Sequence, residues 1–184
     1  MTGKNHLLFG IGAGTLLYMS VILEQDTNEF VHVPVFTKTL ISSSLGALIS
    51  DIDNPKSMIG RRLLFLSYPI NKLVGHRTLF HSFSLIAIIL CIGYILTGGI
   101  DFTNNLYFIS FVTGFLGHLF QDTFTKKGCP LLWPFIRTHV SFTKQKCGNI
   151  SELPITICIL IAYGFFMLRR LEIVEIIHLF LPIY

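Results

Sequence analysis

The sequence predicts an all-α protein, an integral membrane bundle of about four to six short helices with one amphipathic segment at the membrane interface. Of its 184 residues, 52% are hydrophobic and only 13% are charged. Soluble domains usually carry about 25% charged residues, so this deficit is typical of a membrane protein. The hydrophobic residues also fall into separate runs. We expect a single domain over residues 1–184, with a core at 1–150 and a C-terminal apolar segment at 151–184.

Five apolar runs and one weaker run supply the expected helices. A membrane crossing needs about 20 residues, with roughly 17 near the minimum, so several of these runs are short. No small-residue cleavage pattern closes the first run, which we therefore interpret as an uncleaved first helix. The runs are 7–23, 35–50, 83–100, 106–121 and 153–168, with the weaker one at 171–184.

Two segments call for a different interpretation. Residues 61–74 mix basic and apolar side chains, which predicts a helix lying on the inner membrane surface, attracted by anionic lipid and interrupted at Pro69. A crossing by 153–168 would carry Arg169 and Arg170 to the outer side, against the usual charge distribution. A hairpin or an interfacial helix within 153–184 therefore stays open.

The basic residues give an orientation. Of 14 Lys and Arg residues, 11 are Lys4 or lie in 54–77 and 122–152, whereas the loops 24–34 and 98–105 are acidic and contain none. The positive-inside rule then places the N-terminus and both basic segments in the cytoplasm. We expect a multi-pass protein of a bacterial inner (plasma) membrane.

Four cysteines occur without a C-x-x-C pair. Cys91 and Cys158 lie in apolar runs, where a free thiol behaves as a small hydrophobe. Cys129 and Cys147 flank His139 in a polar loop, and a second metal site there is an alternative that the spacing disfavours. We expect all four to be reduced and structural.

Seven side chains of metal-ligand type lie at the ends of the apolar runs, in four short clusters. Ionisable groups near lipid are costly, so their presence in membrane proteins usually indicates function. The orientation above brings all four clusters to the cytoplasmic face, although they were not used to derive it. Imidazole with carboxylate is the ligand set of zinc, manganese and iron sites. The candidate ligands are His6, Asp51, Asp53, His76, His81, His118 and Asp122.

The clusters have local geometries that favour convergence. His118 and Asp122 are four residues apart, so a helix places both on one face, and Gly114 before them permits close helix approach. A simple His–Asp hydrogen bond is the alternative for this pair. Asp51 and Asp53 precede Asn54-Pro55, which predicts an extended chain with both carboxylates on one side.

The third cluster straddles a predicted helix start. Thr78 is a plausible N-cap, which makes His81 the third helical residue and leaves His76 in the preceding loop. Arg77, between the two histidines, is a candidate clamp for an anion. An interfacial His pair with a lipid-contacting Arg is the alternative.

Five stretches in this order resemble a known family. They are Gly3-Lys4-Asn5-His6, Ser50-Asp51-Ile52-Asp53-Asn54-Pro55-Lys56-Ser57, Gly75-His76-Arg77-Thr78-Leu79-Phe80-His81-Ser82, Gly117-His118 with Asp122, and Gly128-Cys129-Pro130 leading to Trp133-Pro134. They are similar to the YdjM-like family of bacterial inner-membrane proteins, described as metal-dependent hydrolases largely by inference.

The resemblance covers residues 1 to about 150. It implies a helical membrane protein, a distant kinship with zinc-dependent phospholipase C-type folds, and metal ligands at the seven positions named above. The chain departs from the family pattern at Thr78 and Phe80, where the family commonly has Gly and Thr.

These observations predict a metal-dependent hydrolase. Seven ligands exceed what one tetrahedral zinc needs and suit two ions bridged by Asp51 or Asp53, with an activated water as nucleophile. We expect one or two divalent ions, zinc or alternatively manganese or iron. Arg77 and Asp53 are the predicted catalytic residues, the first holding a phosphate oxygen and the second relaying a proton.

The predicted substrate is a phosphoester, a small molecule or more favourably a lipid, at the cytoplasmic membrane face. Membrane lipid is an expected partner and nucleic acid is not; the sequence makes no prediction of oligomeric state. Three alternatives stay open. A transporter would place its ligands near the bilayer midplane. A structural metal would have a filled coordination shell. A protease lacks its H-E-x-x-H motif here.

Overall fold

A computed structural model describes residues 1–24, 29–144, 146–148 and 150–180. The regular secondary structure of the described residues is helical apart from an isolated antiparallel bridge between Cys129 and Val140, so the all-α prediction is confirmed. The helices are α1 (Gly3–Glu24), α2 (Glu29–Ile49), α3 (Leu64–Val74), α4 (Phe83–Thr97), α5 (Leu106–Thr123) and α6 (Glu152–Phe180), with short 3-10 helices η1 (Ser50–Asp53), η2 (Leu79–His81) and η3 (Asp101–Asn104).

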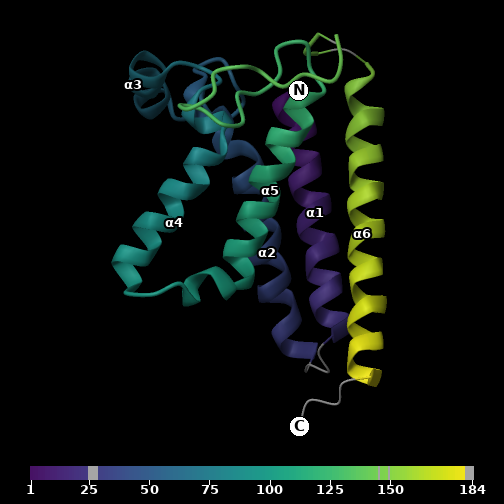
Figure 1. The fold of residues 1–184 in the computed structure, drawn as a ribbon. Coiled ribbons are helices and arrows are strands. Elements are labelled where there is room, and N and C mark those ends of the chain that lie inside the picture. Colours follow the sequence, from purple (N-terminus) through teal and green to yellow (C-terminus); the bar gives the residue numbers. More distant parts are fainter. Residues whose placement is uncertain (25–28, 145, 149, 181–184) are drawn as a thin grey trace.

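Helices α1, α2 and α5 pack against one another, and α6 lies along α1 (Figure 1). Helix α4 packs on α5 near its start, where Leu85 contacts the cluster of Phe115 and Leu119, and then diverges from this group (Figure 1). The loop after α5 and the helix α3 lie at the end of the bundle where α1 begins. The start of α1, the end of α5, the loop after α5 and helix α3 therefore lie at the same end of the molecule.

The predicted helices and the observed ones differ in two places. The runs 153–168 and 171–184 form one helix, α6, at least as far as Phe180, so the hairpin is wrong for this part, and residues 181–184 lie outside the described chain. Helix α3 passes through Pro69 instead of breaking there. The ring is exposed and costs the helix one hydrogen bond, while buried Ser67 fixes the same turn against the protein.

The membrane-spanning part of the fold prediction is not confirmed. Within the residues that the structure describes, no helix combines the length and apolar character that a membrane crossing requires.

Glycines allow the closest helix contact, between α2 and α5. A Cβ on Gly114 would overlap the Ser43 carbonyl, and one on Gly46 would overlap the Phe111 carbonyl. Both obstacles are backbone, which does not move aside as a flexible side chain does. The predicted role of Gly114 in close helix approach is therefore confirmed.

Replacing Gly114 by Ala should destabilise the protein by about 1–3 kcal/mol, because the added methyl group forces α2 and α5 apart. Gly164→Ala in α6 is the matched control, since its Cβ would make only an ordinary 3.4 Å contact with Leu16. That control should be neutral or stabilising by up to about 1 kcal/mol. Thermal unfolding in detergent measures both; equal Tm values would contradict the packing analysis.

Candidate metal centre

The structure brings all seven predicted side chains together at one end of the bundle. They come from α1, η1, the loop before η2, η2 and α5. Three overlapping groups each have ligand atoms within 4.8 Å of one another. The groups are His6, His118 and Asp122; Asp51, His81 and His118; and Asp53, His76 and His81. Their assignment as metal ligands stays a prediction.

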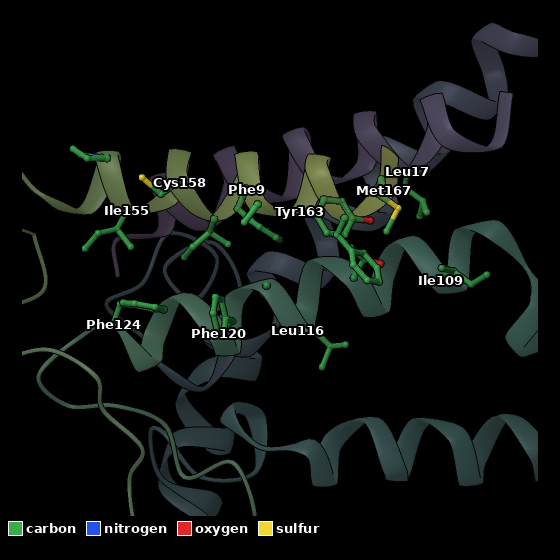
Figure 2. A pocket seen from close by; sticks show the side chains of 16 residues that line it. Phe9, Leu17, Ile109, Leu116, Phe120, Phe124, Ile155, Cys158, Tyr163 and Met167 are labelled. Carbon is green, nitrogen blue, oxygen red and sulfur yellow. The ribbon is translucent and has the colours of Figure 1, made fainter. Parts of the chain in front are cut away.

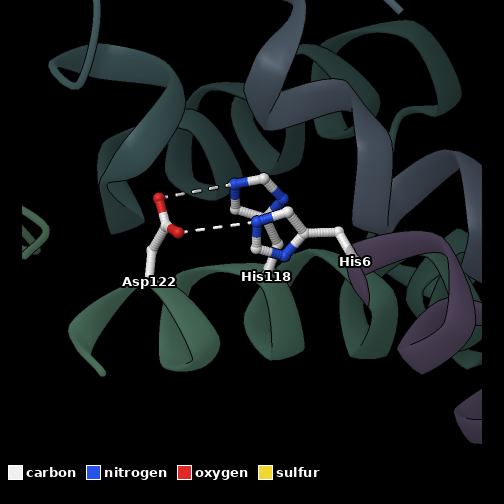
Figure 3. A group of neighbouring side chains, drawn as sticks. All are labelled: His6, His118 and Asp122. Atoms are coloured by element: carbon white, nitrogen blue, oxygen red, sulfur yellow. Dashed lines mark ion pairs between the residues drawn. The ribbon is translucent and has the colours of Figure 1, made fainter. Parts of the chain in front are cut away.

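Asp122 lies at the middle of this cluster. One carboxylate oxygen is 3.5 Å from His6 Nε2, and the other is 3.6 Å from His81 Nε2 and 3.9 Å from His118 Nε2. Figure 3 shows the rings of His6 and His118 stacked side by side, both facing this carboxylate. Two ligands of one tetrahedral zinc lie roughly 3.3 Å apart, so these separations are close to those around a shared ion.

The far nitrogens of two rings are fixed by neutral acceptors. His6 Nδ1 lies 2.6 Å from Gln121 Oε1, and His118 Nδ1 lies 2.6 Å from the Ala47 carbonyl oxygen. Each acceptor requires a proton on Nδ1, so that in the neutral ring Nε2 carries the lone pair. This is the arrangement by which surrounding groups orient metal-binding histidines.

The Nε2 atoms of these rings and of His81 face the Asp122 carboxylate and make no hydrogen bond within the part of the chain that the structure describes. Among the described residues, Nε2 of His6, His81 and His118 has no hydrogen-bond partner, although all three rings are buried. Leaving a buried polar atom unsatisfied costs about 1–3 kcal/mol. Three such atoms around one carboxylate are what a cation-binding site requires.

The Asp53 carboxylate already has hydrogen-bond partners within the protein. Its carboxylate accepts hydrogen bonds from His76 Nδ1 at 2.8 Å and the Arg77 backbone N–H at 3.1 Å, and lies 3.3 Å from His81 Nδ1. Burial alone would raise the pKa of Asp53, but the facing imidazoles of His76 and His81 bring that pKa below its usual value. These contacts favour a role in orienting the histidines; its predicted roles as ligand and proton relay stay predictions.

The expected extended chain at Asp51 and Asp53 is wrong, because both lie in the 3-10 helix η1. The Asp51 carbonyl accepts hydrogen bonds from the Asn54 N–H and the Ser57 hydroxyl, which close the turn. Only Asn54, directly before Pro55, is extended. The two carboxylates therefore join different groups: Asp51 approaches His81 Nε2 at 3.9 Å.

Arg77 is buried and held by the protein in this structure. Its guanidinium contacts Asp122 at 2.8 Å, Thr125 Oγ1 at 3.4 Å and the Gly128 carbonyl. The predicted anion clamp stays a prediction, and a phosphate would have to replace one of these partners. Thr78 is not a side-chain cap, since its hydroxyl donates to the carbonyls of Val74 and Gly75.

Solvent reaches the cluster on one side. The side chains of His76 and Asp51 are 29% and 13% exposed, whereas the other five candidate ligands are at most 2% exposed. The open side lies beside α3, whose Asn71 side chain donates to the Asp53 carbonyl at 2.7 Å. A substrate would meet the centre here.

Sequence reasoning missed two buried polar residues. Gln121 bridges His6 to the Thr156 hydroxyl of α6, at 3.3 Å. Glu152 accepts hydrogen bonds from the Thr2 N–H and the Asn5 amide, both at 2.9 Å, and so ties α6 to the start of α1. The sequence did offer one indication of Gln121: it is a polar residue in an apolar run, three positions after His118.

The cysteines are all free, as expected. Cys129 is fully buried, and burial raises its pKa, as is typical of a structural thiol. His139 instead pairs through Nδ1 with the Lys127 carbonyl at 2.9 Å. None of these residues belongs to a metal-binding group within the described chain.

Gln121→Ala should weaken metal binding by about 10- to 100-fold, because His6 loses the acceptor that fixes its tautomer and ring orientation. Gln121→Glu is the matched control, since it keeps an acceptor oxygen at the same reach and should retain most of the affinity. Titration of metal-stripped protein with zinc, followed calorimetrically, measures both. Equal affinities for the Ala variant and the unchanged protein would remove Gln121 from the site.

All of the chain, residues 1–184, matches the family model described as YdjM inner membrane protein. It is 33% identical over 137 residues to the inner membrane protein YdjM of Escherichia coli (strain K12), covering 73% of this chain and 66% of that protein, and equally to its Shigella flexneri counterpart. It is 32% identical over 173 residues to the uncharacterized protein YvsG of Bacillus subtilis (strain 168), and the match covers 91% of this chain and 96% of that protein.

No solved structure matches the chain. The chain spans just under two thirds of the length of the two YdjM proteins and nearly all of YvsG. Because the match to the family model is complete, the chain belongs to the YdjM family of inner membrane proteins.

Proposed function

We propose that this protein is a metal-dependent hydrolase of the bacterial inner membrane that acts on a phosphoester, most favourably one carried by a lipid, at the cytoplasmic face. The observation that carries the proposal is the set of three buried imidazole nitrogens, from His6, His81 and His118, that face Asp122 without a hydrogen-bond partner among the described residues. Imidazole and carboxylate together are the usual ligands of catalytic zinc.

The charge of the cluster supports a bound cation. With neutral imidazoles, the carboxylates of Asp51, Asp53 and Asp122 face two cationic groups, the Arg77 guanidinium and the Met1 amine. The cluster is left with a net negative charge inside a buried site. A buried charge without compensation is strongly destabilising, which favours uptake of a divalent ion.

Asp122 would help to hold the ions together with two groups of histidines, because one of its oxygens faces His6 and the other faces His81. His6, His118 and Asp122 would hold one ion, and Asp51 with His81 would hold the second. When bound, such ions supply Lewis acidity and lower the pKa of a coordinated water to near 7.

Other residues of the chain would orient the ligands, accept a proton and bind the substrate. Asp53 and Gln121 hold the imidazoles in their orientation. Asp51, at the open edge, can accept the proton of the attacking water, for which buried Asp53 is less accessible. Arg77 neutralises Asp122 and lies close enough to the centre to exchange this contact for a substrate oxygen.

The surroundings of the open side favour a substrate at a membrane surface. Helix α3 lies beside it and exposes Phe65, Tyr68 and Leu73, which are 72%, 68% and 83% exposed. Arg61 and Lys72 are exposed next to these apolar side chains. Basic and apolar side chains on one short helix are typical of segments that bind anionic lipid interfaces.

His118→Ala should lower the bound metal from about two equivalents per chain and reduce phosphoester hydrolysis to background, because one nitrogen ligand is lost. His139→Ala is the matched control, since that exposed ring lies outside the cluster. Elemental analysis and a phosphoester screen on detergent-purified protein measure both effects. Metal-free protein after gentle purification would refute the proposal.

A structural ion is the second candidate, favoured by the near-complete burial of five of the seven side chains. The two functions differ in their response to chelation. A structural ion would be one tight equivalent whose removal lowers Tm by many degrees, with no hydrolysis before or after. For the hydrolase, chelation should abolish hydrolysis and readdition of zinc should restore it, with the helical content unchanged by circular dichroism.

A further inference from the structure

A long apolar groove runs between α5 and α6 over a floor formed by α1 (Figure 2). Its volume is about 890 Å³, within the range of sites that enclose small organic ligands. Of the residues that line it, none is acidic or basic. In Figure 2 the groove extends from Phe124 and Ile155 at one end to Ile109 and Met167 at the other.

The length of the groove corresponds to one acyl chain. Along α5, the distance from Ile109 to Phe120 is roughly 16 Å at 1.5 Å per residue. Half of the hydrocarbon core of a bilayer, which one acyl chain fills, is about 15 Å. An acyl chain lying along the helices would be covered by α5 and α6 on its two sides.

One end of the groove lies near two lysines. Lys126 and Lys127 are exposed in the turn directly after Phe124, which lines one end. At the opposite end the lining residues are apolar, Leu17, Ile109 and Met167. An anionic head beside these lysines and an apolar tail along the groove would match the side chains present.

The geometry points to an anionic phospholipid bound at this groove, with one acyl chain between α5 and α6 and its phosphate at Lys126 and Lys127. The acyl-chain part of this site is separate from the candidate metal centre. The open side of that centre is at His76 and Asp51 beside α3, whereas Phe9 and Gly117, in contact with each other, separate the groove from the buried ligands. The inference does not rest on the proposed hydrolase activity.

Native mass spectrometry of the full-length protein in detergent, with phosphatidylglycerol and phosphatidylcholine added in equal amounts, tests the site. One phosphatidylglycerol per chain should be retained in preference to phosphatidylcholine. Ala162→Trp, which places an indole in the groove, should reduce retention at least tenfold. Ile92→Trp on the exposed side of α4 is the matched control and should leave retention unchanged.

The lysines are tested separately, because their substitution does not alter the packed helices. Lys126→Gln and Lys127→Gln should each lower the preference for phosphatidylglycerol about fivefold, the effect expected of one cationic side chain at an anionic lipid surface. Phosphatidylglycerol with a diazirine in its acyl chain should cross-link to peptides from α5 and α6.

Three results would overturn the inference. The first is equal lipid retention by the Ala162→Trp variant while its helical content and metal content match those of the unchanged protein. The second is cross-linking confined to α4 or α3. The third is a stable dimer without bound lipid whose chains cross-link through α6, since a second copy would then fill the groove.

Discussion

The buried carboxylate of Asp122 is the constraint on which the arrangement of this end of the bundle depends. It is only 2% exposed, and a charge in that position destabilises the fold unless neighbouring groups compensate for it. The compensating cations come from elements far apart in the chain: the Met1 amine just before α1 and the Arg77 guanidinium from the loop before η2. Helix packing and site assembly are therefore one event, because the charge is tolerated only when these elements have met.

The helix contacts set how closely those groups can approach. Gly114 lies against the backbone of α2, one turn before His118, and this contact lets the His118 ring reach the Ala47 carbonyl of α2. A wider separation of α2 and α5 would break that hydrogen bond and release the ring. Gly114 of α5 thus acts on the candidate metal centre through the orientation of one imidazole.

Much of the helical fold and of the candidate site could be predicted from the sequence, and what could not be predicted has physical causes. Spacing within one helix places His118 and Asp122 together, and the positive-inside rule brings the other clusters to the same end. Spacing does not reveal which ring nitrogen faces which acceptor, so the part played by Asp53 and Gln121 emerged only from the structure. The 3-10 turn at Asp51 was missed because hydrogen bonds to its carbonyl, from Asn54 and Ser57, outweigh the extended preference that Pro55 imposes on a single residue.

The open edge and the apolar groove lie on different sides of the same cluster, beside α3 and beside α6, which stand on opposite sides of α1 and α5 in Figure 1. One lipid molecule seated in the groove would have the packed wall of Phe9 and Gly117 between its acyl chain and the buried histidines. Its phosphate, at Lys126 and Lys127, would lie on the turn whose Thr125 and Gly128 contact Arg77. With its acyl chain behind this wall, a lipid bound in the groove would support the packing of α5 and α6.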